Sequence, residues 1–523
     1  GFVYRLSRSG GGGAFPQRLS ETGLFSDVST LEPAPALIEY TVESEGWSDD
    51  AIKRRWIALP GRERIHFRAS AAWSFPVGTV LVKHFALARP TGGERRVSTR
   101  LFVRQENDWA GVSYRWLDPP TDAELVLDGG VDEIDLGGGQ THSWRFPSPS
   151  ECLSCHTSAA GRVLGVRTRQ LHEPFDYPPH GEYPGGELNQ LEAWSRGELF
   201  DIDIRDPARY ERSPGLDDFV ASRTSRVRAY TATNCAICHQ PHGPAPGEVD
   251  FRFSQAIGDW NAIDVPVAQD DFSIPDVRII APGDRGRSMV WVRQSTTEVG
   301  TRMAPGTLLA HAQAVDLLGD WIDSDAATVD SDEDGHPDSV DRCPAIADPL
   351  QADRDGDGIG DRCDPDDLPD LSIAEVFVSA SASLTEGDPV ALAAIVGNGG
   401  IMASADFPVA FYLSQDAAYD PDDIPVDHCW IESIGGGGLA LCSASDAQIP
   451  TGLPGTGIPP TSYYFVACAD AANIGPDADD GNDCTASSTP VLVPEPSAFW
   501  LQTFGAAALA LSSRRRMRGR KGS

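Results

Sequence analysis

The sequence has few basic residues for its length and very few methionines. Its 523 residues include 42 Lys and Arg against 77 Asp and Glu, which gives a formal net charge of −35. Because nucleic-acid phosphates are bound by clusters of Lys and Arg, this balance argues against a nucleic-acid partner. The chain contains only four Met, so few thioether side chains are available as metal ligands.

Long apolar segments are also scarce. No run of about 20 apolar residues, the length that spans a bilayer, occurs before the far C-terminus. The N-terminus has neither an initiating Met nor an apolar signal segment, and we expect that an export signal has been removed or omitted. The 52 Gly and 40 Pro predict a loop-rich, largely non-helical molecule. Its length allows about three or four domains.

Two short motifs contain four of the ten cysteines. They read ECLSCH at 151–156 and NCAICH at 234–239. In C-x-x-C-H the two thiols attach haem covalently and the His ligates the iron. The motifs therefore assign two haem c groups to this chain, one to Cys152, Cys155 and His156, and one to Cys235, Cys238 and His239. A zinc ribbon built from both Cys pairs is the alternative, but it requires no His after each pair.

The sixth ligands of the two irons are harder to assign. Met303, followed by Ala304 and Pro305, is the predicted distal ligand of the second haem, because a thioether favours Fe(II) and raises the potential. Met289 is the fallback, and a Met used only as core filler is the structural alternative. For the first haem the candidates are His84, His142 and His172, each of which also suits an ordinary structural role, or else water or no ligand.

The remaining pattern predicts several domains. Residues 1–140 alternate apolar and polar positions, which indicates a β-rich N-terminal domain. Residues 141–215 form the first haem segment, with short helices. Residues 216–325 are expected to form an α-helical region similar to a small class I cytochrome c. Two helices with apolar stripes flank its haem motif and methionine: one carries Phe219, Val220, Val227 and Tyr230, the other Leu308, Ala312, Val315, Leu318 and Trp321.

Residues 18–322 resemble a bacterial family of dihaem c-type cytochromes. The resemblance rests on LSETGLFSD, SDDAIKRRWIALP, WSFPVGTVLVKHFAL, RRVSTRLFVR and SYRWL, together with the haem segment that follows them. It identifies relatives and implies haem, but it assigns no reaction.

The acidic stretch at 326–368, the acidic linker, contains two twelve-residue loops. DSDEDGHPDSVD begins at 330 and DRDGDGIGDRCD at 353, and each places carboxylates at positions one, three, five, nine and twelve with Gly at six. Calcium prefers six to eight oxygen ligands, and Gly permits the sharp turn. The predicted ligands are Asp330, Asp332, Asp334, Asp338 and Asp341, then Asp353, Asp355, Asp357, Asp361 and Asp364. With Cys343 and Cys363, the stretch resembles a thrombospondin type 3 repeat, a calcium-stiffened spacer. A disordered acidic linker is the alternative.

Residues 369–493 alternate short strands with Gly, Asn and Asp turns, which predicts a β-sandwich of roughly seven strands. The six cysteines outside the haem motifs imply about three disulfides and an oxidising compartment. The stretch resembles the bacterial cell-adhesion-related Ig-like domain. On that reading Cys468 and Cys484 join the last hairpin, and Cys429 and Cys442 another.

The C-terminal residues 494–523 contain Pro-Glu-Pro, a short apolar run and an Arg cluster. They resemble the PEP-CTERM sorting signal, which implies an exosortase-type processing enzyme as a partner and a transient membrane anchor. A permanent tail anchor is the alternative.

These features predict an exported dihaem c-type cytochrome, located in the periplasm, outer envelope or extracellular space. We expect it to carry single electrons between redox protein partners, and no catalytic residue is assigned. The alternative is a haem enzyme, a peroxidase or small-molecule oxidase, with an open first haem.

Overall fold

The computed structural model describes residues 15–177, 186–268, 270–298, 300–353, 357–379, 384–420, 423–450, 461–470 and 483–493. The chain divides into two compact units, one with residues up to Leu368 and one that begins at Pro369. The division lies at the expected boundary between the acidic linker and the β-sandwich. The predicted sorting signal at 494–523 lies outside the described residues.

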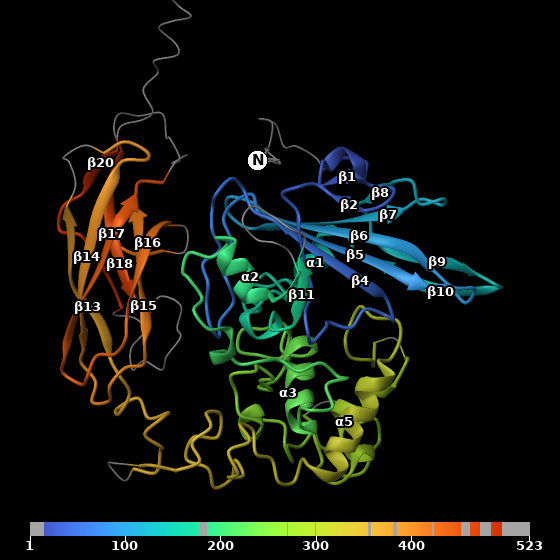
Figure 1. The fold of residues 1–523 in the computed structure, drawn as a ribbon. Helices are drawn as coiled ribbons and strands as arrows, with labels where there is room; N and C mark the ends of the chain where they lie inside the picture. Colours follow the sequence, from blue (N-terminus) through green and yellow to red (C-terminus); the bar gives the residue numbers. More distant parts are fainter. Residues whose placement is uncertain are drawn as a thin grey trace, which may run out of the picture. The chain divides into compact units, whose positions relative to one another are not determined.

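A six-stranded antiparallel meander dominates the N-terminal part of the first unit (Figure 1). Its strands, in spatial order, are β3 (Ile38–Tyr40), β4 (Ile52–Ala58), β5 (Val80–Ala88), β6 (Glu94–Arg104), β7 (Trp109–Trp116) and β8 (Ala123–Val126). Smaller pairs are β1 (Phe25–Asp27) with β2 (Glu32–Pro33), β9 (Gly130–Gly137) with β10 (Gln140–Phe146), and β11 (Pro174–Tyr177) with β12 (Gly186–Asn189). The predicted β-rich character of this part is therefore present.

The two faces of the meander have different environments. One face is an apolar core in which Trp56, Val82, Leu101, Val112 and Tyr114 are buried together. This follows from the alternation along β4 to β7, because successive side chains of a strand point to opposite faces. The other face carries polar and aromatic side chains, among them Lys83, Phe85 and Arg100, which line one cavity together with the first C-x-x-C-H motif.

The expectation of an α-helical cytochrome domain at 216–325 is wrong. This stretch contains three α-helices, α3 (Arg223–Asn234), α4 (Met289–Ser295) and α5 (Ala312–Ser324). Elsewhere in the described residues only α1 (Pro149–Cys155) and α2 (Gln190–Arg196) are α-helical. Between α3 and α4 the chain passes through left-handed residues at His242, Asn261 and Asp264, and this backbone conformation interrupts a helix.

The predicted helix stripes are correct only in part. Phe219 and Val220 lie before α3 and are 80% and 98% exposed, whereas Val227 and Tyr230 are buried. In α5, Leu318 and Trp321 are buried. Ser222 caps α3 by accepting a hydrogen bond from the Ser225 amide, so the helix begins later than the apolar pattern indicates. Among the described helices, none has both the length and the apolar character needed to cross a membrane.

The second unit is a sandwich of two antiparallel sheets. One contains β13 (Leu371–Ser379), β14 (Pro389–Asn398) and β17 (Leu439–Gln448). The other contains β16 (Ile424–Ile431), β15 (Phe407–Ser414), β18 (Thr461–Ala469) and β19 (Cys484–Ala486), and β20 (Val491–Val493) pairs with β18. The sequence pattern predicted roughly seven strands, and the described residues form eight.

Three disulfides are present, with the predicted partners. Cys468 and Cys484 face each other on β18 and β19. Cys429 on β16 and Cys442 on β17 join the two sheets, so this bridge does not close a hairpin within one sheet as expected. The third, Cys343–Cys363, closes a loop of the acidic linker.

Candidate functional site

Both C-x-x-C-H motifs face one cavity of about 1330 Å³ in the first unit. Its walls include all six motif residues and two methionines: Cys152, Cys155, His156, Cys235, Cys238, His239, Met289 and Met303. Small-molecule sites commonly have volumes of about 300–1,000 Å³. The cavity is thus larger than one ordinary ligand requires, and both motifs open onto it.

The first motif lies on α1, which packs against β7. The hydroxyl of Ser148 accepts from the Glu151 amide while the Glu151 carboxylate accepts from the Ser148 amide, a capping box that fixes the start of the helix. Gly111 on β7 lets the helix approach closely, since a Cβ added there would lie 2.8 Å from Cys152 Cβ. The absent side chain of Gly111 therefore creates the space in which Cys152 lies.

His156, at the end of α1, is held in one tautomer. Its Nδ1 lies 2.6 Å from the carbonyl oxygen of Arg162, and because a carbonyl only accepts, Nδ1 carries the proton and Nε2 keeps its lone pair. The ring packs against Phe102, with centroids 4.3 Å apart. Burial lowers the pKa of His156 to about 4, and the cationic Lys83 and Arg100 act in the same direction. The imidazole is therefore neutral at pH 7, as an iron ligand must be.

The second motif follows α3 directly. Cys235 is the C-cap of α3, and the His239 amide donates to the Cys235 carbonyl at 2.9 Å. The His239 ring meets Phe251 edge-on at 5.7 Å. Its Nδ1 is buried without a hydrogen-bond partner, and burial lowers its pKa. Buried polar atoms ordinarily have a hydrogen-bond partner. A group bound in the cavity can supply the interaction that fixes the orientation of the His239 ring.

The motif thiols are not arranged as a zinc site, and three of them lack the lowered pKa of a redox thiol. None is in a disulfide. Burial raises the pKa of Cys152, of Cys238, and of Cys235 to about 12, whereas reactive thiols have lowered pKa values. Among the described residues, only Asp330, Asp332 and Asp334 bring three potential ligand atoms close enough for one metal ion. The thiols therefore do not form a preassembled zinc ribbon.

The loop of residues 296–298 and 300–311, the methionine loop, places Met303 at the cavity wall. The Met303 amide donates to the Arg293 carbonyl at 3.0 Å. The guanidinium of Arg302 donates to carbonyls on both sides of the loop, at Thr297 and Leu308. These bonds close the loop around Arg302, and the neighbouring Met303 lines the cavity.

The N-terminal domain also holds the methionine loop. Asp49 Oδ1 accepts from the amides of Leu308 and Leu309 at 2.7 and 2.8 Å. Trp47 donates from its indole to the Leu309 carbonyl at 3.0 Å and stacks on His311 with ring centroids 3.9 Å apart. The position of Met303 thus depends on residues about 250 positions earlier in the sequence, which no local pattern predicts.

The three histidines considered for the first haem are not in the cavity lining. His84 points to the opposite face of the meander, where Nδ1 meets Thr99 Oγ1 at 2.9 Å and the ring meets Trp116. His142 contacts the carbonyl oxygens of Ser143 and Asp49. Neither these two nor His172 lines the cavity. Of the described residues, the only histidines in the lining are those of the two motifs.

The residues present fit two c-type haems. Each motif offers two reduced thiols and one imidazole to the same cavity. The His156 tautomer leaves Nε2 available, and the unpartnered Nδ1 of His239 is a buried donor or acceptor at the second motif. The donor set is the one that attaches and ligates haem.

Sequence reasoning missed the cations of the cavity wall. Arg55, Lys83 and Arg100 lie on β4, β5 and β6 and line the cavity. A signal for one of them was present, because Lys83 interrupts the otherwise apolar stretch TVLVKHFAL. A charged residue inside such a strand points to a special environment.

The first acidic loop brings three of its predicted ligands together. Oxygens of Asp330, Asp332 and Asp334 lie within 4.8 Å of one another. Burial raises the pKa of Asp332 to about 6, and the neighbouring carboxylates act in the same direction. Oδ2 of Asp332 and Oδ2 of Asp341 are buried without a hydrogen-bond partner. Asp338 is engaged differently, because it accepts from Ser331 and from the Gly258 amide.

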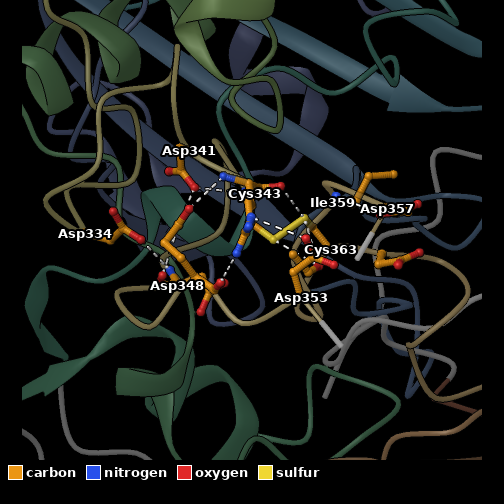
Figure 2. Close-up of a disulfide and its surroundings, with 12 residues drawn as sticks. Asp334, Asp341, Cys343, Asp348, Asp353, Asp357, Ile359 and Cys363 are labelled. Atoms are coloured by element: carbon orange, nitrogen blue, oxygen red, sulfur yellow. Dashed lines mark hydrogen bonds and ion pairs between the residues drawn. A yellow bond between two sulfur atoms is a disulfide. The ribbon is translucent and has the colours of Figure 1, made fainter. Parts of the chain in front are cut away.

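The second acidic loop lies beside the Cys343–Cys363 disulfide (Figure 2). Asp353 approaches Arg342 at 3.4 Å, and Asp357 accepts from the Ile359 amide at 2.7 Å. Asp355 lies outside the described residues, and Asp361 and Asp364 are buried. The described carboxylates of this loop do not form a group like that of the first loop.

In the comparison with protein families, residues 317–351 match the thrombospondin type 3 repeat. The match contains the first acidic loop and Cys343 but ends before the second loop, and it does not reach the haem motifs. No curated protein matches the chain.

Solved structures with local likeness each cover 24% of the chain. The CARDB domain of a Pyrococcus furiosus protein, in complex with di-metal ions, matches over 89% of its own length at 16% identity and a TM-score of 0.17. A putative cell surface protein domain from Methanosarcina acetivorans matches over 94% at 17% identity and a TM-score of 0.17. A β-glucosidase from Erythrobacter marinus matches over 15% at 12% identity and a TM-score of 0.16. Likeness at this level supports no conclusion about function.

Proposed function

We propose that this chain is an exported c-type cytochrome that binds two haems covalently and passes single electrons between redox proteins of the cell envelope. The observation that carries the proposal is the convergence of both C-x-x-C-H motifs on one cavity. Bound haem supplies a one-electron Fe(III)/Fe(II) couple. Two haems bound in one cavity can exchange electrons with each other, whereas two haems bound at separate sites would act independently.

The chain's own residues prepare this site. Cys152 and Cys155, and Cys235 and Cys238, provide the thiols for attachment, while His156 and His239 provide the proximal imidazoles. The Arg162 carbonyl fixes the tautomer of His156. Met303 is the distal thioether proposed for the second haem, held by the bonds of the methionine loop. The apolar and charged side chains of the lining together influence the potential of each iron.

A second function is favoured by the lining of the cavity. His84, His142 and His172 are all outside it, so none is in place to ligate the first haem. An iron with no strong sixth ligand can bind peroxide or another small molecule. The alternative is therefore a haem enzyme, a peroxidase or small-molecule oxidase, acting at the first haem.

The visible spectrum of the haem-loaded chain, oxidised and reduced, with and without carbon monoxide, tests both functions. Electron transfer requires two covalent haems that are six-coordinate and do not bind carbon monoxide. A high-spin haem that binds the gas supports the enzyme instead. A Cys152→Ala, Cys155→Ala variant should lose one haem and, for the enzyme, the gas-binding signal. A chain that matures without covalent haem refutes both functions.

We also propose that calcium binds the acidic linker, most directly at Asp330, Asp332 and Asp334. The buried, unpartnered carboxylate oxygens and the raised pKa of Asp332 support a cation there, because a positive ion removes both penalties. An oxidising, calcium-rich location outside the cytoplasm agrees with the three disulfides. Processing of residues 494–523 by an exosortase-type enzyme belongs to the same proposal and awaits a test by mass analysis of the mature chain.

A further inference from the structure

Three cations form a row across the central strands of the meander. Arg55 on β4 is the register partner of Lys83 on β5, and Lys83 is the register partner of Arg100 on β6. All three line the cavity beside the first haem motif. Like charges directly opposite each other on neighbouring strands destabilise a sheet. A row of three therefore needs compensation by negative charge.

The protein compensates only one end of the row. Arg55 forms an ion pair with Glu45 at 2.7 Å, and Lys53 binds the same carboxylate. Among the described residues, Lys83 and Arg100 form no ion pair. Arg100 donates one hydrogen bond to the Arg145 carbonyl and stacks over Phe85, while its Nε is buried without a partner.

The carboxylates that line the cavity stay beyond ion-pair distance of Lys83 and Arg100. Lys83 lies over the Phe85 ring at 5.2 Å and contacts no carboxylate. The carboxylates of Asp49, Glu151, Glu248 and Asp270 also line the cavity, but among the described residues none of them forms an ion pair with Lys83 or Arg100. The charge of Asp49 acts on Arg100 without direct contact and opposes the effect of burial only in part. Burial lowers the pKa of Lys83 well below its ordinary value, and the charge of Arg55 lowers it further. Burial likewise lowers the pKa of Arg100 to about 10. Both side chains therefore lie where burial disfavours their charge, and an anion bound beside them would offset that cost.

We propose that Lys83 and Arg100, with Arg55 beside them, form an anion-binding site in the wall of the cavity, and that its ligand is a carboxylate or a small oxyanion. A guanidinium and an ammonium side by side offer a planar donor pair and a point charge to the same anion. Two sources can supply that chemistry: the propionate groups of a haem bound at the first motif, or a free anion that enters the cavity. Assignment to propionates rests on the proposed function, whereas the anion site itself does not.

The test uses the full chain in two forms, loaded with haem and produced without haem, with acetate and inorganic phosphate as probes. The variants are Lys83→Met and Arg100→Met. The control is Arg54→Met, which removes a cation from the neighbouring position of β4, where Arg54 pairs with Glu39 and stacks on Trp56 and does not line the cavity. Calorimetric titration and anion-dependent thermal stabilisation are measured for each form.

The expected result is saturable anion binding by the haem-free chain, weakened at least about tenfold by Lys83→Met or Arg100→Met, which corresponds to about 1.4 kcal/mol, and unchanged by the control. If propionates are the ligand, the haem-loaded chain no longer binds the probes, and Lys83→Met lowers the reduction potential of the first haem, because removal of a positive charge favours Fe(III). If a free anion is the ligand, the haem-loaded chain keeps the binding and Lys83→Met weakens it there too.

The proposal is overturned if neither form binds the probes and if the potential and haem content of Lys83→Met and Arg100→Met equal those of the control. A variant that does not fold is replaced by Lys83→Gln or Arg100→Gln, with folding checked by circular dichroism. A chain that carries no covalent haem refutes the proposed function but still allows the anion titration, so the two failures are distinguishable.

Discussion

Substitution of Gly111 by alanine is expected to displace the first C-x-x-C-H motif. The added Cβ would lie 2.8 Å from Cys152 Cβ, 3.1 Å from Cys152 Sγ and 3.3 Å from a ring carbon of Phe102, whereas ordinary contacts lie at 3.4–4 Å. The nearest atom is the Cβ of a short side chain on α1, which cannot rotate away. Strand β7 and helix α1 must therefore move apart.

The cost of this displacement can be bounded from the local structure. Overpacking of a well-packed site costs about 1–3 kcal/mol. Loss of the chain freedom that glycine has in the unfolded state returns about 0.4–1 kcal/mol. Gly111 has no left-handed backbone conformation, so no further strain is added. We expect a net loss of about 1–2 kcal/mol and a thermal midpoint lower by a few degrees.

Two measurements check this expectation. Calorimetry gives the midpoint of the unit that contains Cys152, and intact-mass analysis counts the haems attached to each chain. We expect a lower midpoint and a smaller fraction of chains with the first haem. Gly435→Ala is the matched control, since a Cβ added at Gly435 meets nothing within 4 Å. If Gly111→Ala behaves like this control in both assays, the close approach of β7 and α1 is not required.

Three further predictions concern other parts of the chain. Asp49→Ala removes two hydrogen bonds to the methionine loop, which should lower its local stability by about 1–3 kcal/mol. Amide hydrogen exchange in that loop should therefore become faster, whereas Asp50→Ala at the exposed neighbour should leave it unchanged. Equal exchange rates in the two variants would contradict the role of Asp49. Burial lowers the pKa of His84 to about 3 from an ordinary value of 6.5, so between these pH values the unfolded chain binds the extra proton and the free energy of unfolding rises with pH. His84→Gln should reduce that slope by about 1.4 kcal/mol per pH unit, and an unchanged slope in urea titrations would refute the assignment. Calcium should protect the acidic linker from proteolysis, and Asp332→Asn should weaken that protection; cleavage that is equal with calcium and with chelator counts against a bound ion.

The β-character of both large domains could be read from the sequence because a strand has a side-chain period of two. The alternation along RRVSTRLFVR places Val97, Leu101 and Val103 in apolar cores, and these residues are buried. The same logic predicted strands at 369–493, because Gly, Asn and Asp turns separate the apolar runs there. The helical prediction at 216–325 failed because apolar residues at helical spacing, such as Phe219 and Val220, lie in exposed coil.

The sequence by itself determined the chemistry that the chain can offer: two C-x-x-C-H motifs, carboxylates in twelve-residue loops, and six further cysteines. The C-x-x-C-H motifs and the acidic loops are local patterns, since each lies within a dozen residues. Only the tertiary structure decided that both C-x-x-C-H motifs open onto one cavity, that His84 faces away from it, and that Lys83 and Arg100 lie side by side in its wall. Those relations depend on strand register and on contacts between segments far apart in the chain, which no periodicity along the sequence encodes.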